Sequence, residues 1–402
     1  MQETNEINNK KGRGVTKRFH ETAFIFPFSY EGGQRNWKKH FESQELENYW
    51  VKSQDIYSKH FLKHILNDEN KPFHYEMQAG LLPACNHNGI MKVESVLNKK
   101  KMLRTYEVIV IGLSLFVFPT GIGFITLRVK YPENTEIGEI ADFSADFSRI
   151  IANEMGVAES RVGCKIGDSK FLFTEFLNQI VGKTDENKIT FFPCTNGKRA
   201  FVFQRISGDC VSGIEKRALK NNLWIDSREV INDVTEICHD LEVANDRYCM
   251  FSPTTMCVVS KEIEGTEEEI RRRENNVRFS YFNLYLLCIH EYQALILYNQ
   301  KKVLIGKKFG ASRKIKQELL RFLPAYSFDV ISIERSYQEV YLTLKKILFL
   351  EEMEESLKDN ISMLEAAYVQ KRDDIVNIVL AFISVLGLVS VVIDVITALK
   401  LI

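Results

Sequence analysis

The hydrophobic positions near the end of the chain form one long run. Residues 375–393 read IVNIVLAFISVLGLVSVVI, nineteen residues without a charge. A helix of this length covers about 29 Å at about 1.5 Å per residue, close to the thickness of the hydrocarbon core of a bilayer. A buried core helix is the alternative, but such a helix usually keeps a polar face and is rarely this long. The pattern predicts a transmembrane helix over residues 375–399.

A second helical pattern leads directly into this run. Residues 326–373 contain neither proline nor glycine, and apolar residues recur at steps of three or four, which places them on one helical face. The members of this series are Val340, Leu344, Ile347, Leu350, Met353, Leu357, Ile361, Leu364 and Tyr368. We expect one uninterrupted stalk helix over residues 326–373, as in a coiled coil, that continues into the membrane.

Runs of β-branched and aromatic residues predict strands earlier in the chain. Residues 106–118 and 122–129 are rich in such residues and flank Pro119-Thr120-Gly121, so we expect a β-hairpin there. Residues 23–28 are a further strand candidate. Pro27 suggests that this strand lies at a sheet edge, because proline donates no hydrogen bond to a neighbouring strand.

Two more strand pairs follow. Residues 189–193 and 199–206 flank Asn196-Gly197, and Asn-Gly between apolar runs is a strong signal for a two-residue hairpin. Residues 248–260 are predicted to form another pair, with a turn near Ser252-Pro253. The hairpin pattern therefore occurs more than once.

Helical spacing separates these strands. It predicts helices over residues 37–66 and 137–155, and over residues 168–181 with Asp168 as the N-cap. Residues 261–275 are dense in charges of both signs, which suits an exposed helix or connector.

The elements together predict an α+β fold. We expect a cytoplasmic antiparallel-sheet domain with helices, followed by a long C-terminal stalk helix that continues into a transmembrane helix. The expected domains are a polar tail over residues 1–20, a body over 21–325, the stalk over 326–373 and the membrane helix over 375–399. The repeated hairpins allow the body to be divided into halves over residues 21–185 and 186–325.

Composition favours a body in the cytoplasm. The 53 basic and 53 acidic residues balance, so net charge gives no argument for direct nucleic-acid binding. Eight scattered cysteines without a Cys-x-x-Cys pair favour a reducing compartment. The polar start of the chain lacks the apolar stretch of a signal peptide. We expect a single C-terminal span that holds the cytoplasmic body to the cell membrane.

No motif in the sequence supports catalysis or identifies a cofactor site. Walker, dinucleotide-binding and serine-hydrolase motifs are absent. His60 and His64 have a spacing suited to zinc, but no further ligand motif accompanies them, so we interpret them as a solvated or structural pair. The triplet Cys85-Asn86-His87 is interpreted as incidental, and the basic residues 99–101 as surface. His290 lies on an otherwise apolar helical face and is expected to be a hydrogen-bonded core histidine.

The layout from Tyr248 to the end of the chain matches a known membrane architecture. An α/β segment is followed by the stalk sequence YSFDVISIERSYQEVYLTLKKILFLEEMEESLKDNISML and then by the apolar run. This order resembles the CorA family of divalent-cation channels. The Gly-Met-Asn loop of that family and its second span are absent here, so its ion-selectivity residues are not carried over.

The resemblance implies a ring-shaped homo-oligomer that is gated from the cytoplasm, with a divalent cation as an implied partner. CorA-like proteins also occur as membrane effectors beside antiviral systems that make nucleotide second messengers. A small nucleotide is therefore a second implied ligand.

Small and polar residues recur along the membrane run. Their separations of four, three, three, four and three positions place them on one stripe of a supercoiled helix. The stripe is polar or small at five of its six positions and consists of Asn377, Ala381, Ser384, Gly387, Val391 and Asp394. Because no second span is predicted, its partners must come from other copies or from another protein. In a pore, Asp394 would form a carboxylate ring that selects cations; alternatively, Asp394 lies hydrated at the far interface and only ends the span.

These observations lead to two functional hypotheses. The first is an oligomeric CorA-like channel or membrane effector gated by its cytoplasmic domain, in antiviral defence. The alternative is a membrane-tethered sensor or scaffold whose body binds a protein or a small molecule. Oligomer size distinguishes them, since cross-linking that stops at dimers would favour the scaffold.

Overall fold

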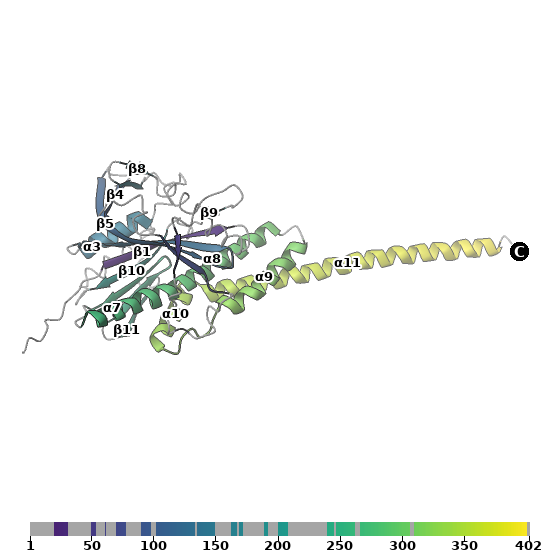
Figure 1. Cartoon of the computed structure of the whole chain (residues 1–402). Helices are drawn as coiled ribbons and strands as arrows, with labels where there is room; N and C mark the ends of the chain where they lie inside the picture. The colour runs from purple at the N-terminus through teal and green to yellow at the C-terminus, as the bar shows by residue number, and fades with distance from the viewer. Residues whose placement is uncertain are drawn as a thin grey trace, which may run out of the picture. The chain divides into compact units, whose positions relative to one another are not determined.

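A computed structural model of the chain describes most of the predicted elements (Figure 1). The described residues are 20–30, 50–53, 61, 70–77, 90–97, 102–132, 135–148, 162–166, 169–171, 189–191, 200–207, 239–244, 247–261, 266–305 and 309–399. The chain forms two compact units. One comprises Met1–Ala294 and Pro324–Phe349, and the other comprises Leu295–Leu323 and Leu350–Ile402.

The first unit is built on a mixed β-sheet of thirteen strands among the described residues, in the order β11-β12-β13-β10-β1-β6-β5-β4-β7-β8. Strand β3 pairs with β5, β2 with β3, and β9 with β1. The strands are β1 His20–Tyr30, β2 Trp50–Lys52, β3 Phe73–Met77, β4 Ile90–Leu97, β5 Met102–Val117, β6 Ile122–Lys130, β7 Val162–Ile166, β8 Ser169–Phe171, β9 Ile189–Phe191, β10 Phe201–Ser207, β11 His239–Ala244, β12 Arg247–Ser252 and β13 Thr255–Ser260. The sequence predicted an antiparallel sheet, and the pairs are antiparallel except for β10 with β13, which are parallel.

Two of the predicted hairpins are confirmed. Strands β5 and β6 pair across the predicted turn, where Gly121 has a φ of 86°, a conformation that favours glycine. The backbone N–H of Tyr30 donates to the Gly121 carbonyl at 3.0 Å, which ties the turn to β1. Strands β12 and β13 form the second hairpin, in which the Ser252 hydroxyl accepts the N–H of Thr255 at 3.1 Å.

The edge position predicted for the first strand is wrong. Strand β1 is central and pairs with β6 on one side and with β10 and β9 on the other. Pairing with β10 ends at Ile25, and pairing with β9 begins at Phe28. Since the Tyr30 N–H points toward β6, the alternation of the strand turns Pro27 toward the other side. There it falls between the positions that pair with β10 and those that pair with β9, and no described strand residue pairs with it on that side.

Other local predictions are also corrected. Strands β9 and β10 do not pair with each other but lie one after the other along β1, because β1 offers both a long apolar partner. The helix predicted over residues 37–66 is contradicted at Trp50–Lys52, which is strand β2 paired with β3. The helix predicted over residues 168–181 is contradicted at Ser169–Phe171, which is strand β8. The turn at Asn196-Gly197 lies outside the described residues.

Helices cover both faces of the central strands. On one face, α3 (Ile137–Ser148), predicted over residues 137–155, packs Phe143 and Phe147 against Phe24, with ring centroids 5.6 and 4.6 Å apart. On the other face, α8 (Phe282–Ile305) packs Phe282 against Phe203 at 5.5 Å. Polar residues within these strands are therefore enclosed between layers rather than turned to solvent.

The charged stretch before α8, for which the sequence allowed an exposed helix or a connector, contains a helix. Helix α7 (Glu267–Asn276) begins with a capping box, in which the Thr266 hydroxyl accepts the N–H of Glu269 at 3.3 Å and the Glu269 carboxylate accepts the N–H of Thr266 at 3.0 Å. A π-helical turn, η2 (Val277–Tyr281), joins α7 to α8.

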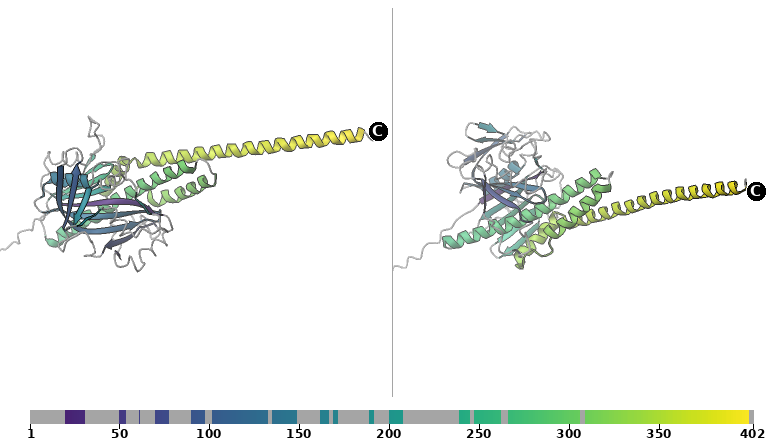
Figure 2. Two further views of the ribbon diagram at one scale, coloured as in Figure 1. Left: turned by 90° about the horizontal axis from the view of Figure 1, so that it is seen from above. Right: turned by 45° about the vertical axis from the view of Figure 1, so that its right-hand side comes forward.

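The predicted stalk is two helices rather than one. Helix α10 (Arg335–Ile347) is separated from α11 (Leu350–Leu399) by a break at Phe349. Its φ of 54° is incompatible with a right-handed α-helix. Leu348 and Leu350 are buried while Phe349 is 60% exposed, so the break buries both leucines at the cost of a strained backbone. From Leu350 onward α11 is continuous, as Figures 1 and 2 show.

The second unit combines the end of α8, most of α9 (Phe309–Tyr326) and α11. Tyr298 and Phe322 pack with ring centroids 5.6 Å apart. Further buried side chains are Ile315, Leu319, Leu350, Leu357 and Ile361. These residues occur at helical spacing on α9 and on the first turns of α11, so the apolar stripe predicted for the stalk is used there for packing.

Candidate functional site

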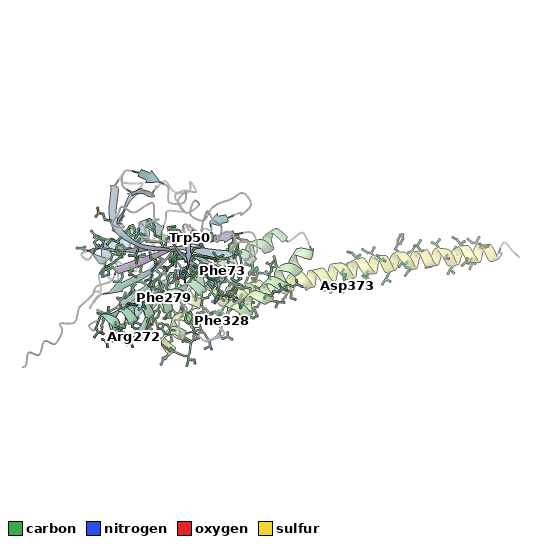
Figure 3. The ribbon with its side chains drawn as sticks, viewed as in Figure 1. Trp50, Phe73, Arg272, Phe279, Phe328 and Asp373 are labelled. Atoms are coloured by element: carbon green, nitrogen blue, oxygen red, sulfur yellow. The ribbon has the colours of Figure 1, made fainter. Side chains whose placement is uncertain are left out.

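The end of α11 is the apolar helix that the sequence predicted. Arg372–Thr397 is long and apolar enough to cross a membrane, and it is the one such helix among the described residues. None of it is buried, and Figure 3 shows its side chains projecting all around the helix beyond Asp373. Exposure of so much apolar surface to water is unfavourable by about 25 cal/mol per Å². The segment is therefore suited to a lipid or protein environment.

All six residues of the predicted stripe lie on this exposed part of α11: Asn377, Ala381, Ser384, Gly387, Val391 and Asp394. The Ser384 hydroxyl donates to the Leu380 carbonyl at 2.8 Å, so its hydrogen is satisfied within the helix. A Cβ added at Gly387 would meet no atom within 4 Å. Nothing within the described chain therefore requires a glycine at this position.

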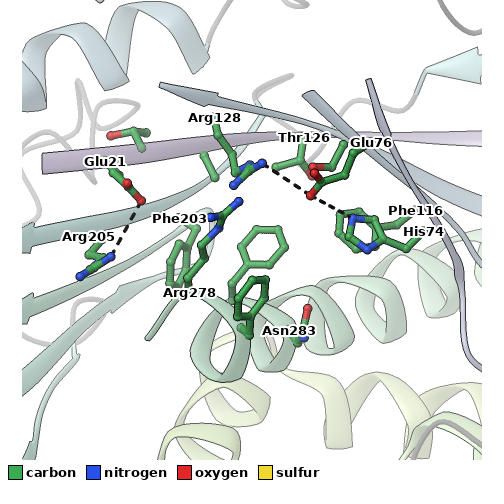
Figure 4. Close-up of a pocket in the computed structure, with 15 residues that line it drawn as sticks. Glu21, His74, Glu76, Phe116, Thr126, Arg128, Phe203, Arg205, Arg278 and Asn283 are labelled. Atoms are coloured by element: carbon green, nitrogen blue, oxygen red, sulfur yellow. Dashed lines mark ion pairs between the residues drawn. The ribbon is translucent and has the colours of Figure 1, made fainter. Parts of the chain in front are cut away.

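A second candidate site, which we call the arginine pocket, lies in the first unit between the sheet and η2 (Figure 4). Strands β1, β3, β5, β6 and β10 each contribute a pair of residues spaced i, i+2, so these paired side chains share the sheet face opposite α3; Thr22 of β1 also lines the pocket. The pairs are Glu21 and Ala23, His74 and Glu76, Ser114 and Phe116, Thr126 and Arg128, and Phe203 and Arg205. Helical residues Arg278, Phe279, Phe282 and Asn283 close the opposite side. The cavity of the pocket has a volume of about 50 Å³.

Two ion pairs in the pocket join an arginine to a carboxylate, and both are long. Arg128 lies 3.6 Å from the Glu76 carboxylate, and Arg205 lies 4.0 Å from that of Glu21. Close charge-assisted hydrogen bonds are about 2.7–2.9 Å long. The third arginine, Arg278, forms no ion pair with any described residue, and its guanidinium lies 5.3 Å from the centre of the Phe279 ring.

The Thr126 hydroxyl oxygen and Arg128 Nε, both in the pocket, have no hydrogen-bond partner among the described residues, and Thr126 has no solvent exposure. Unsatisfied buried polar atoms are uncommon in native proteins and often mark the position of a water, an ion or a ligand.

Backbone features make room for this arrangement. Gly112 on β5 is paired with Arg128, and a Cβ at Gly112 would lie 2.5 Å from Arg128 Nη2. The guanidinium therefore occupies space that any other residue at position 112 would fill. The π-helical turn η2 carries Arg278 and Phe279, and such turns are frequent at functional sites.

His290 behaves as the sequence predicted. Its side chain is fully buried, Nε2 lies 2.8 Å from the Thr120 hydroxyl, and its ring stacks on Phe118 at 3.9 Å. Burial lowers the pKa of His290 from 6.5 to about 3. No group of metal ligands occurs in the part of the chain that the structure describes. His60, His64, the triplet 85–87 and the basic residues 99–101 lie outside that part.

No protein-family model matches this chain, and no curated protein is significantly similar to it. The candidate sites therefore depend on the physical features of the chain itself.

The arginine pocket was not predicted from the sequence. The sequence pattern that corresponds to the pocket is a polar residue at every second position of an otherwise apolar strand, as in Thr126 and Arg128 within ITLRV. Each strand alone is compatible with a solvent-exposed face. The register of five strands is needed to bring these residues together.

Proposed function

We propose that this protein is an oligomeric membrane protein, a CorA-like channel or membrane effector, in which a cytoplasmic body controls the membrane helix. The observation that carries the proposal is the exposed apolar end of α11 with its stripe of small and polar residues. A plain lipid anchor needs only apolar side chains, whereas a close helix–helix contact in a bilayer favours small and polar ones.

Gly387 supports association within the membrane. Glycine costs a helix about 1 kcal/mol relative to alanine, and no atom of the described residues lies within 4 Å of a Cβ added at Gly387. A neighbouring copy of α11 packed along the stripe would use that space. Asp394 of each copy would then form a carboxylate ring that favours cations, and the setting that the family resemblance implies is antiviral defence.

The first test is the size of the oligomer. The full chain purified in detergent is cross-linked and sized, both as the wild type and as Gly387→Leu, which places a large side chain on the stripe. A ring-forming channel requires more than two copies, and Gly387→Leu should dissociate them. Cross-linking that stops at dimers would favour the alternative function, a membrane-tethered sensor or scaffold.

The second test is ion flux through planar bilayers or liposomes. Asp394→Ala should abolish cation flux or selectivity, because it removes the carboxylate ring. Asp374→Ala is the matched control, since it removes an exposed carboxylate from the same helix at the other end of the apolar run. Cation flux that is unchanged by Asp394→Ala would remove the pore from the proposal.

A further inference from the structure

The arginine pocket has more positive than negative groups. Arg128, Arg205 and Arg278 face two carboxylates, Glu21 and Glu76. Arg278 pairs with neither of them. An arginine keeps its charge at any ordinary pH, so the pocket retains a surplus positive charge that cannot be removed by deprotonation.

The surplus charge lies in a partly apolar enclosure. The rings of Phe116, Phe203, Phe279 and Phe282 line the pocket together with the arginines. Apolar walls exclude water and strengthen the interaction between a guanidinium and an anion relative to the same contact at an open surface. Figure 4 shows Arg128 and Arg278 directed toward the same part of the pocket, from the sheet and from η2 respectively.

Some hydrogen-bond donors in the arginine pocket have no acceptor among the described residues. The Thr126 hydroxyl and Arg128 Nε have no partner among the described residues, and the Glu76 carboxylate stays 3.6 Å from Arg128. An oxyanion between Arg128 and Arg278 would accept from both guanidinium groups and from Thr126. Donors from two directions suit a tetrahedral anion with several oxygens better than a planar carboxylate, which offers two.

We propose that the arginine pocket binds a phosphate group, held chiefly by Arg128 and Arg278 with the Thr126 hydroxyl as a further donor. The size of the cavity matches a group of a few heavy atoms, because each water needs about 10–15 Å³ of such space and about 50 Å³ is open here. The phenylalanine rings offer a surface for an apolar part attached to the phosphate. This site does not depend on the membrane function proposed above.

The direct test is calorimetric titration of the full chain in detergent with inorganic phosphate, at constant ionic strength set with sodium chloride. We expect saturable binding that Arg278→Gln and Arg128→Gln each weaken at least tenfold. Arg272→Gln is the matched control, because Arg272 is exposed on α7, outside the pocket, and its loss should leave binding unchanged. The absence of saturable phosphate binding to the wild type would overturn the proposal, as would equal losses in Arg278→Gln and Arg272→Gln.

A second variant tests the geometry without removing a charge. Gly112→Ala places a methyl group against Arg128 Nη2, the mobile end of a flexible side chain, so it should displace the guanidinium while the fold is kept. We expect weaker phosphate binding with an unchanged circular dichroism spectrum. Full phosphate affinity in a folded Gly112→Ala protein would contradict the role of Arg128.

A third titration distinguishes the source of the phosphate group. Phenyl phosphate carries the same anion with an aromatic ring attached. Tighter binding than inorganic phosphate, lost in Arg278→Gln, would identify a phosphate ester that uses the phenylalanine walls. Tighter binding of inorganic phosphate would identify the free ion. Phenyl phosphate binding that persists undiminished in both Arg278→Gln and Arg128→Gln would show that the ring rather than the phosphate is recognised, against the proposal.

Discussion

The buried His290 should make the stability of the first unit depend on pH. Its imidazole lies between the Phe118 and Tyr326 rings, with centroids 3.9 and 4.6 Å away, and bonds to the Thr120 hydroxyl. Burial lowers its pKa to about 3, against 6.5 for the unperturbed group. Between these values the unfolded chain takes up a proton that the native state refuses, so stability is lost as the pH falls below 6.5.

The size of this effect follows from the two pKa values. At pH 7 the unfolded histidine is mostly neutral, whereas at pH 5 it is almost fully protonated and the native one is not. The free energy of unfolding should therefore fall by about 2 kcal/mol between pH 7 and pH 5 through His290 alone. Replacement by phenylalanine keeps an aromatic ring in the stack and removes the titrating group.

The assay is urea unfolding of the full chain in detergent at pH 7 and pH 5, followed by tryptophan fluorescence. His290→Phe should lose about 2 kcal/mol less than the wild type over this interval, even if its stability at pH 7 is lower by about 1 kcal/mol through the lost hydrogen bond to Thr120. Thr120→Ala is the control, because it removes that hydrogen bond but keeps the buried imidazole. Equal losses in the wild type and in His290→Phe would refute the reasoning.

Two further predictions concern the backbone. Gly123→Ala would place a Cβ 2.2 Å from the buried Phe28 ring and should lower the free energy of unfolding by about 1–3 kcal/mol. Gly138→Ala has open space around its Cβ in α3 and should raise the free energy of unfolding by about 0.5 kcal/mol. Urea unfolding that changes the stability of both variants in the same direction would contradict this. Phe349→Gly should be neutral or stabilising by up to about 1 kcal/mol, because glycine adopts the left-handed φ of this exposed position without strain. Phe349→Val should be destabilising, because a β-branched residue adopts a positive φ at a higher energetic cost. The same unfolding assay measures both effects.

Local signals in the sequence were sufficient for some elements of the fold. The β5–β6 and β12–β13 hairpins were predicted because their turn residues lie between the strands that they join. The apolar end of α11 was predicted because the hydropathy of a membrane helix depends on composition alone. The break at Phe349 had no such signal, since no glycine or proline marks it. It accompanies the burial of Leu348 in the first unit and of Leu350 in the second, which the sequence alone does not reveal.

Pairings between distant strands needed the whole sheet. Strands β9 and β10 suggested a hairpin because they are neighbours in the sequence, but β1 offers each of them an apolar partner that is more than 150 residues away. Pro27 illustrates the same limit. A proline in a strand argues for an edge only when the strand has one continuous neighbour on each side, and β1 has two neighbours in succession on one side.

The arginine pocket follows from a similar argument about faces. Along β6, Thr126 and Arg128 alternate with the apolar residues Ile125, Leu127 and Val129. In a sheet with one exposed face, this alternation would place Thr126 and Arg128 on the face turned to solvent. Once α3 covers one face and α8 the other, the same alternation places a hydroxyl and a guanidinium inside the protein, where each needs a partner. Burial of both faces is thus what converts an ordinary strand pattern into evidence for a ligand. Arg278, on the opposing π-helical turn, forms no ion pair with a described residue, which favours an anion as that ligand.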